Sequence, residues 1–192
     1  MKMFWYGKAT RLGALALLTT LLAGEAPAAT RWSIDPAHTR VGFGIDAVGY
    51  PRTNGVFRKF DGRIDIDFAR PELSHVVFHV DANSVDVGSD SFNDYLKSDG
   101  YLDSARHPEI DFTSRSVVQV DDKTVRVEGD LTLLGVTRPL SVNVTVQRDP
   151  SGKKLEFAAH ARINRLEFGM NGGFPAVSGE LDLDIATRAV AL

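Results

Sequence analysis

The 192-residue chain contains no cysteine. Disulfides, thiolate catalysis and metal sites with cysteine ligands are therefore excluded. The chain also has no large excess of either charge, because 22 Lys and Arg stand against 25 Asp and Glu. Without a basic stripe it is a poor candidate for a nucleic-acid-binding protein. No low-complexity tract or internal repeat is evident, which argues against a disordered chain or a solenoid.

No apolar run reaches the roughly 18 residues of a membrane-spanning helix. The most apolar stretch, Leu12–Leu22, follows three basic residues and precedes a small-residue site that ends at Ala28. This three-part layout predicts a secretory signal peptide over residues 1–28, cleaved to leave a mature domain over residues 29–192. The expected compartment is the bacterial periplasm, and no membrane span is expected in the mature chain.

Apolar and polar residues alternate along much of the chain from Thr30 onward. Successive side chains of a strand point to opposite faces, so each such segment has one apolar and one polar face. Short strands with short connections favour antiparallel neighbours, which bury their apolar faces in a barrel or a sandwich. The alternating segments are Val41–Ile45, Arg63–Phe68, Val76–Asp81, Val125–Glu128, Leu140–Gln147, Leu155–Ile163 and Leu181–Ala186.

Turns are predicted where residues suited to a positive or fixed φ gather. These sites are Asn54-Gly55, Asp61-Gly62, Asp149–Gly152 and Asn171–Gly173. One segment, Ser89–Lys97, breaks the period of two. Its Phe92, Tyr95 and Leu96 have helical spacing, which predicts one short helix. That helix either closes an end of the sheet as a lid or packs against an outer edge.

Several short motifs follow one another along the chain. They are Trp32–Thr39 with Val41–Phe43, Gly55–Phe57 with Phe60–Gly62, Ser84–Asp86, Lys97–Asp103, His107–Phe112, Gly129–Leu140 and Arg165–Met170. Each motif alone is weak, but their order is specific. Together they resemble the YceI-like family of polyisoprenoid-binding periplasmic proteins, over Trp32 to Ile185. The match is least complete at Ala47–Gly49, where many relatives place a histidine; without it, no head-group contact by a histidine is expected there.

The resemblance implies an all-β fold: an extended antiparallel eight-stranded, lipocalin-like β-barrel with a short helical excursion. It also implies an apolar pore that holds a long isoprenoid or a similar lipid. A barrel of eight strands either fills with side chains or holds one small ligand. Small inward residues such as Ala159 and Ala161 leave room for a slender chain. Burial of about twenty ligand carbons contributes roughly 16 kcal/mol gross, reduced by the costs of association.

The expected ligand-binding residues are apolar positions of the inward strand faces and of the barrel mouth. The expected wall residues are Phe43, Ile45, Ile64, Ile66, Phe78, Phe112, Leu133, Phe157, Leu181 and Leu183. The expected mouth residues are Phe92, Tyr95, Leu96, Phe168 and Met170. Packing in an ordinary core is the alternative for each of them.

No metal site is expected, although the chain has five histidines. His75 and His79 are four residues apart in a strand segment, which separates them by about 13 Å. One ion with ligands near 2.1 Å cannot bind both. Both lie on the polar face, so they are interpreted as solvated histidines.

No catalytic residue is expected either. Asp65-x-Asp67 and Asp182-x-Asp184 could supply paired carboxylates, but strand alternation points them outward to solvent. The chain has no nucleophile elbow, no P-loop and no dinucleotide-binding glycine motif.

The first functional hypothesis is a carrier of a polyisoprenoid, an isoprenoid quinone or a fatty-acid-like lipid, with no cofactor besides the lipid. The second is a lipocalin-like enzyme acting on a lipid, which needs a titratable group with a shifted pKa inside the barrel. The third is a stress-related protein-interaction module, for example with a membrane redox partner. A homodimer remains open.

Overall fold

The structure is a computed structural model that describes residues 30–192. The predicted signal peptide and its cleavage site lie outside the described residues. Ten strands, one α-helix and three short 3-10 helices make up the described part. The strands are β1 (Thr30–Ala47), β2 (Tyr50–Phe57), β3 (Phe60–Ile66), β4 (His75–Asp81), β5 (Val85–Asp86), β6 (Glu109–Gln119), β7 (Thr124–Leu133), β8 (Val136–Arg148), β9 (Lys154–Asn164) and β10 (Val177–Ala191). The helices are η1 (Pro71–Leu73), η2 (Ala82–Ser84), α1 (Asp90–Lys97) and η3 (Arg165–Phe168).

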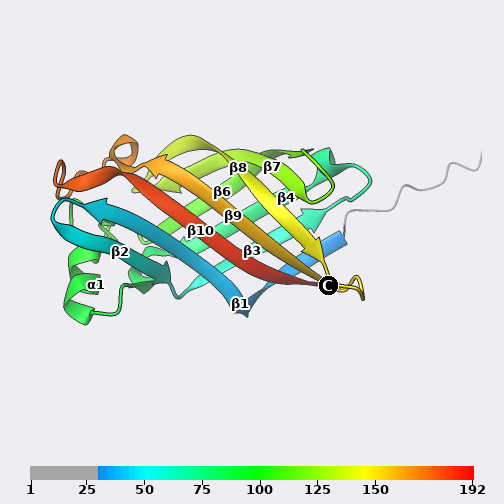
Figure 1. The fold of residues 1–192 in the computed structure, drawn as a ribbon, viewed down its shortest axis with the longest axis horizontal. Helices are drawn as coiled ribbons and strands as arrows, with labels where there is room; N and C mark the ends of the chain where they lie inside the picture. The colour runs from blue at the N-terminus through cyan, green and yellow to red at the C-terminus, as the bar shows by residue number, and fades with distance from the viewer. Residues whose placement is uncertain (1–29) are drawn as a thin grey trace, which may run out of the picture.

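Eight of the strands close into an antiparallel barrel (Figure 1). Their order around the barrel is β10-β9-β8-β7-β6-β4-β3-β1, and β1 pairs again with β10. Closure leaves no free edge among these strands, which protects them from pairing with other chains. The closed eight-stranded barrel with one short helix confirms the predicted fold.

The first barrel strand, β1, pairs with two different strands along the same edge. Its first residues, Thr30–Ser33, pair with β3, whereas Val41–Ala47 pair with β2. Between the two halves the register against β10 shifts, so that the segment from Asp35 to Arg40 bulges. The bulge is stabilised by Thr39, whose hydroxyl donates to the carbonyl of Asp35 (2.8 Å). The strand therefore bends here and extends the wall with β2 and the short β5.

Two of the predicted turns are wrong. Asn54-Gly55 lies inside β2 and Asp61-Gly62 lies inside β3. Both glycines are there for packing, because a Cβ at Gly55 would meet the ring of Phe43 and one at Gly62 would meet Phe78. The true turns between these strands fall at residues 48–49 and 58–59.

The hairpin between β7 and β8 has a connection of only two residues. Leu134 (φ 54°) and Gly135 (φ 71°) both have a positive φ, as a two-residue hairpin turn with the twist of its strands requires. The turn holds a long register in which Leu133 pairs with Val136 and Thr124 with Thr145. The predicted turns at Asp149–Gly152 and Asn171–Gly173 do connect elements.

The barrel has two different ends (Figure 1). At the first, here called the helix end, α1 lies beside the start of β2. The Gly172 N–H donates to Gly100 O (2.7 Å), which ties the loop after α1 to the loop before β10. The second, here called the charged end, is formed by Phe68, Asp121–Lys123 and Arg148. These residues follow β3, join β6 to β7 and end β8.

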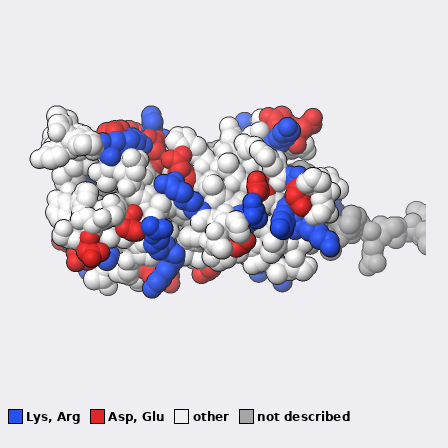
Figure 2. All heavy atoms as spheres, turned by 60° about the horizontal axis from the view of Figure 1, so that its bottom comes forward, with Lys and Arg blue, Asp and Glu red and all other residues white. Residues whose placement is uncertain are grey.

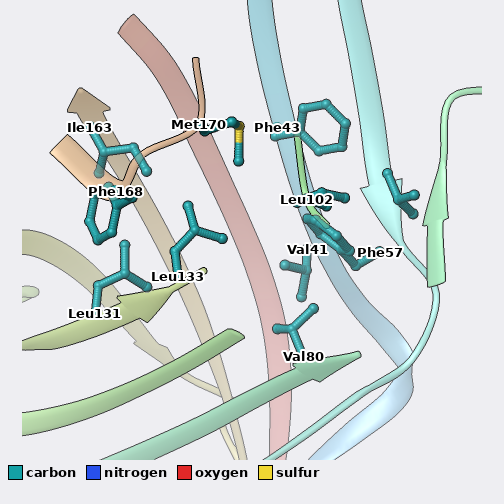
Figure 3. Packing of buried hydrophobic residues seen from close by; sticks show 11 residues of the cluster. Val41, Phe43, Phe57, Val80, Leu102, Leu131, Leu133, Ile163, Phe168 and Met170 are labelled. Atoms are coloured by element: carbon teal, nitrogen blue, oxygen red, sulfur yellow. The ribbon is translucent and has the colours of Figure 1, made fainter. Parts of the chain in front are cut away.

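The buried side chains form two clusters, one toward each end. The cluster toward the helix end includes Phe43, Phe57, Leu102 and Met170, and Figure 3 shows its members facing one another from different walls. The other contains Trp32, Ile34, Ile64, Leu155 and Ala189. The outer surface carries the charges: Figure 2 shows Lys and Arg side chains next to Asp and Glu across one face.

Candidate functional site

The barrel encloses a cavity of about 1360 Å³. Ligand pockets in proteins commonly measure roughly 300–1,000 Å³, and packing defects are much smaller. An eight-stranded barrel packed solid by its own side chains would leave no such space. The interior is thus a built chamber that extends to both the helix end and the charged end.

The wall of the cavity follows from strand alternation. Every second residue of a barrel strand points inward, and on these strands the inward residues are aliphatic or aromatic. On β8 they are Leu140, Val142, Val144 and Val146; on β9 they are Phe157, Ala159, Ala161 and Ile163; on β10 they are Leu181, Leu183 and Ile185. Ala159 and Ala161 are successive inward residues of β9, and their small side chains widen the chamber along this strand.

All but one of the sequence-predicted binding residues lie on this cavity wall. Those that do are Phe43, Ile45, Ile64, Ile66, Phe78, Phe92, Tyr95, Leu96, Phe112, Leu133, Phe157, Met170, Leu181 and Leu183. The exception is Phe168, which is 3% exposed and packs in the core cluster toward the helix end. It ends η3, and the left-handed Gly169 that follows places Met170 on the wall instead. That the wall residues contact a ligand stays a prediction.

Other wall residues had not been predicted. The inward positions of β8, and those of β7 apart from Leu133, were missed although they follow the same alternation that identified Leu181 and Leu183. These include Val125, Val127, Leu140, Val142, Val144 and Val146. Phe68 belongs to the apolar positions of the predicted segment Arg63–Phe68 but had not been named as a binding residue. Lys123 and Arg148 had no such signal, because only the closed barrel brings the start of β7 and the end of β8 to the mouth of the cavity.

Two tyrosines pair at the helix end of the cavity. The hydroxyl oxygens of Tyr95 and Tyr101 lie 2.8 Å apart, and the ring centroids are 4.7 Å apart. Burial, together with the hydrogen bond between Tyr101 and Tyr95, raises the pKa of Tyr101 to about 12. Tyr101 therefore stays neutral at physiological pH, and the pair forms an aromatic wall between α1 and the loop that follows it.

An arginine lies beneath this wall with no exposed surface. Arg165 is 0% exposed and donates to three backbone carbonyls: Ser178 O (2.7 Å), Met170 O (2.5 Å) and Val177 O (3.1 Å). Burial lowers the pKa of Arg165 from its ordinary value. Because these hydrogen bonds join the loop before β10 to the first two residues of β10, this cation holds backbone in place and its hydrogen bonds are not directed at the cavity.

The charged end brings two opposite walls into contact. β3 and β8 are four strands apart in either direction around the eight-stranded barrel. Nevertheless the guanidinium of Arg148, the last residue of β8, lies 3.9 Å from the ring centroid of Phe68, which follows β3. Both residues line the cavity, so this cation–π contact spans and narrows the mouth.

Asp67 departs from the sequence prediction, which placed it outward in solvent. β3 ends at Ile66, so the alternation does not extend to Asp67, which is 4% exposed. Its carboxylate accepts from the backbone N–H groups of Ala69 and Arg70 and from the Arg70 guanidinium (2.9 Å). The Asp67 carboxylate therefore stabilises the loop between β3 and η1 through these hydrogen bonds, and it is not a free catalytic acid.

Asp182 also departs from that prediction, for a different reason. It does point away from the cavity, but Arg52 and Arg162 cover it, so its side chain is only 10% exposed. The Arg162 hydrogen bond, followed by the one from Arg52, lowers the pKa of Asp182 to about 2. Asp65 lies outward as predicted and pairs with Arg31 and Arg63. Asp184 is exposed and pairs with His160.

The two histidines of β4 lie on the outer face, where they face different partners. His79 Nδ1 lies 2.5 Å from Asp111 Oδ1, and the hydrogen bond to this carboxylate raises the pKa of His79. His75 Nδ1 lies 3.2 Å from the hydroxyl of Ser114. Within residues 30–192, no three His, Cys, Asp or Glu side chains are grouped to hold a metal ion.

The arrangement is suited to holding an apolar chain. Within the described residues, the titratable side chains of the cavity wall gather at its two ends, whereas the long middle section is hydrocarbon with few polar groups. One of these is Thr187, whose hydroxyl lies 2.6 Å from that of Thr39. In the described range no helix is long and apolar enough to cross a membrane.

Comparison with known proteins gives consistent relatives. The YceI-like domain matches residues 32–189. The chain is 35% identical over 185 residues to a UPF0312 protein of Pseudomonas savastanoi pv. phaseolicola, covering 93% of this chain and 96% of the relative. A UPF0312 protein of Pseudomonas putida is likewise 35% identical, over 183 residues, and the match covers 92% of this chain and 95% of that one.

Solved structures share the fold. BcnA of Burkholderia cenocepacia superposes with a TM-score of 0.76 at 24% identity, covering 82% of this chain and 99% of BcnA. A polyisoprenoid binding domain from Saccharophagus degradans, implicated in plant cell wall breakdown, gives a TM-score of 0.69 at 19% identity and covers 84% of this chain and 98% of that domain. At these identities the likeness concerns the fold alone.

Proposed function

This chain belongs to the YceI-like family, and we propose that its barrel binds one molecule of a long apolar lipid. The observation that carries the proposal is the chamber of about 1360 Å³ whose middle section is walled mainly by hydrocarbon side chains. Contact between so large an apolar surface and water is unfavourable. A hydrocarbon chain that binds there is stabilised by about 0.8 kcal/mol per buried methylene.

The proposed ligand is a polyisoprenoid, an isoprenoid quinone or a fatty-acid-like lipid. A long, narrow chamber closed around eight strands suits a single slender chain better than a compact ring system. The fold shared with a polyisoprenoid binding domain of Saccharophagus degradans supports the same class. The bound lipid is the only non-protein group proposed.

We propose a carrier and not an enzyme. A lipid-modifying enzyme needs a reactive group within reach of its substrate. Three titratable groups of the cavity wall are already engaged: Asp67 by Arg70, Tyr101 by Tyr95 and Arg165 by backbone carbonyls. Their geometry favours structural roles at the two ends of the cavity.

The carrier is proposed to act in the periplasm, after removal of the signal peptide predicted over residues 1–28. A protein that shields an apolar chain from water fits transport across an aqueous compartment. The homodimer, the membrane redox partner and the stress-related interaction remain predictions from the sequence. Cell fractionation, with sequencing of the mature N-terminus, tests the compartment.

Native mass spectrometry of protein purified without detergent tests lipid binding. We expect a mass increment that disappears after extraction with organic solvent, and the extract should contain one lipid class with a long apolar chain. A protein that runs at its polypeptide mass, and that does not take up an added neutral apolar probe, contradicts the proposal.

A further inference from the structure

The charged end of the cavity differs from the helix end because its cationic side chains have no carboxylate partner among the described residues. At the helix end, the Tyr95 and Tyr101 hydroxyls bond to each other and Arg165 bonds to three carbonyls. At the charged end, Arg148 and Lys123 line the cavity, and neither forms an ion pair with any carboxylate in residues 30–192. The two ends are therefore not equivalent for an amphipathic ligand.

Arg148 is held in place without using its hydrogen-bond donors. Its guanidinium stacks over the Phe68 ring at 3.9 Å, and stacking leaves the five N–H groups free in the plane of the guanidinium. Many other arginines of the barrel are already bound to carboxylates, as Arg188 is to Glu156 (2.6 Å) and Arg162 to Asp182 (2.7 Å). Arg148 is thus an oriented cation at the mouth of an apolar chamber.

The acidic residues at this mouth are mostly engaged. Asp67 is bound by Arg70 and by two backbone N–H groups. Asp121 accepts from the N–H of Lys123 (2.8 Å), and this hydrogen bond holds the pKa of Asp121 below its ordinary value. Asp122 is exposed and forms no ion pair and no side-chain hydrogen bond within residues 30–192.

We propose that the charged end is the head-group site of the cavity and that it selects a single-chain lipid with an anionic head, a carboxylate or a phosphate. Arg148 binds the head through paired N–H donors and Lys123 adds a second positive charge. The tail runs along β8, β9 and β10 toward the tyrosines of the helix end. The inference rests on the proposed lipid binding and narrows its ligand class.

The test compares three ligands that share one sixteen-carbon tail: hexadecanol, hexadecanoate and hexadecyl phosphate. Each displaces the neutral apolar fluorophore N-phenyl-1-naphthylamine from delipidated protein. We expect the two anions to bind about tenfold more tightly than the alcohol, the ordinary worth of one charge-assisted hydrogen bond. Comparison of the two anions decides between a carboxylate and a phosphate head.

Variants identify the site. Arg148→Gln and Lys123→Gln should each remove most of the advantage of the anions and leave the affinity for hexadecanol unchanged. Arg126→Gln, on an exposed arginine of β7, is the matched control and should change none of the three affinities. Added salt should weaken only the anions, because it screens exposed charges.

Three results overturn the inference. Equal affinities for the alcohol and the two anions show that the cavity does not prefer a charged head group. An anion preference that survives both glutamine variants but is lost in Tyr95→Phe or Tyr101→Phe places the head at the helix end. Failure of the fluorophore and of all three lipids to bind overturns the proposed lipid binding itself, a result distinct from the first two.

Discussion

Arg52 on β2 reaches across β1 to the carboxylate of Asp182 on β10, and it passes over Gly44 on the way. Gly44 is the residue of β1 that pairs with Asp182, and a Cβ there would collide with the guanidinium of Arg52. Arg162 binds the other carboxylate oxygen (2.7 Å). One carboxylate thus links three strands on the outside of the barrel.

Asp182 should make the barrel sensitive to acid. Its folded-state pKa of about 2 lies below the ordinary value of 3.8, so the ion pairs stabilise the protein above about pH 4 and the effect is lost as the pH falls toward 2. We expect Asp182→Asn to lower the urea midpoint at pH 6 and to leave it nearly unchanged at pH 2. A difference between wild type and variant that stays constant from pH 6 to 2 contradicts this.

Gly44→Ala should act through Arg52. The added methyl group displaces a flexible guanidinium, so its main cost is the lost ion pair with Asp182, not backbone strain. We expect Gly44→Ala and Arg52→Ala to destabilise by similar amounts and the double variant to be no worse than either alone. Additive losses in a double-mutant cycle would show that Gly44 is required for another reason.

Arg165 should be required for stability. Arg165→Met leaves three carbonyls without their donor, and each unsatisfied buried group costs about 1–3 kcal/mol. We expect a loss of at least ~3 kcal/mol, which lowers Tm by about 6–12 °C in a domain of this size. Calorimetry measures it, with the exposed Arg126→Met as control, expected within about 0.5 kcal/mol of wild type. Similar melting of the two variants argues against the role.

Ala161→Phe should block the cavity without unfolding the barrel. The larger side chain enters open space, so it removes room for several methylenes, each worth ~0.8 kcal/mol, and affinity falls at least ~tenfold. Native mass spectrometry should find less bound lipid, while the Tm of the delipidated variant equals that of the delipidated wild type. The neighbouring Ala158→Phe points outward on the same strand and should keep its lipid. Equal lipid retention by the two variants locates the ligand elsewhere.

Strand alternation predicted the inward face of the barrel well. Phe157, Leu181 and Leu183 lie on the cavity wall because each belongs to a strand whose period continues unbroken. The prediction that Asp67 points outward was wrong because β3 ends at Ile66, two residues before the end of the alternating pattern at Phe68. Phe168 was assigned to the mouth from its neighbourhood in sequence, but a 3-10 turn moves it into the core.

Other features depended on partners distant in sequence, which no local pattern reveals. Asp182 is 130 positions from Arg52, so its burial under two arginines could not be read from the Asp182-x-Asp184 spacing. Gly55 and Gly62 suggested turns because turns are the commonest local use of glycine. Their actual role, to make room for the rings of Phe43 and Phe78, appears only when strands pair.

The pairing of Trp32 with Ala191 has a consequence for biosynthesis. The seam between β1 and β10 joins the two extremes of the described chain, so a nascent polypeptide cannot complete it until its final strand has been made. Until then the hydrocarbon interior is open to solvent and to other chains, and such long-range closure is slow. The barrel therefore closes only after β10 has been made, and until then its unpaired strands offer a surface that a chaperone would bind.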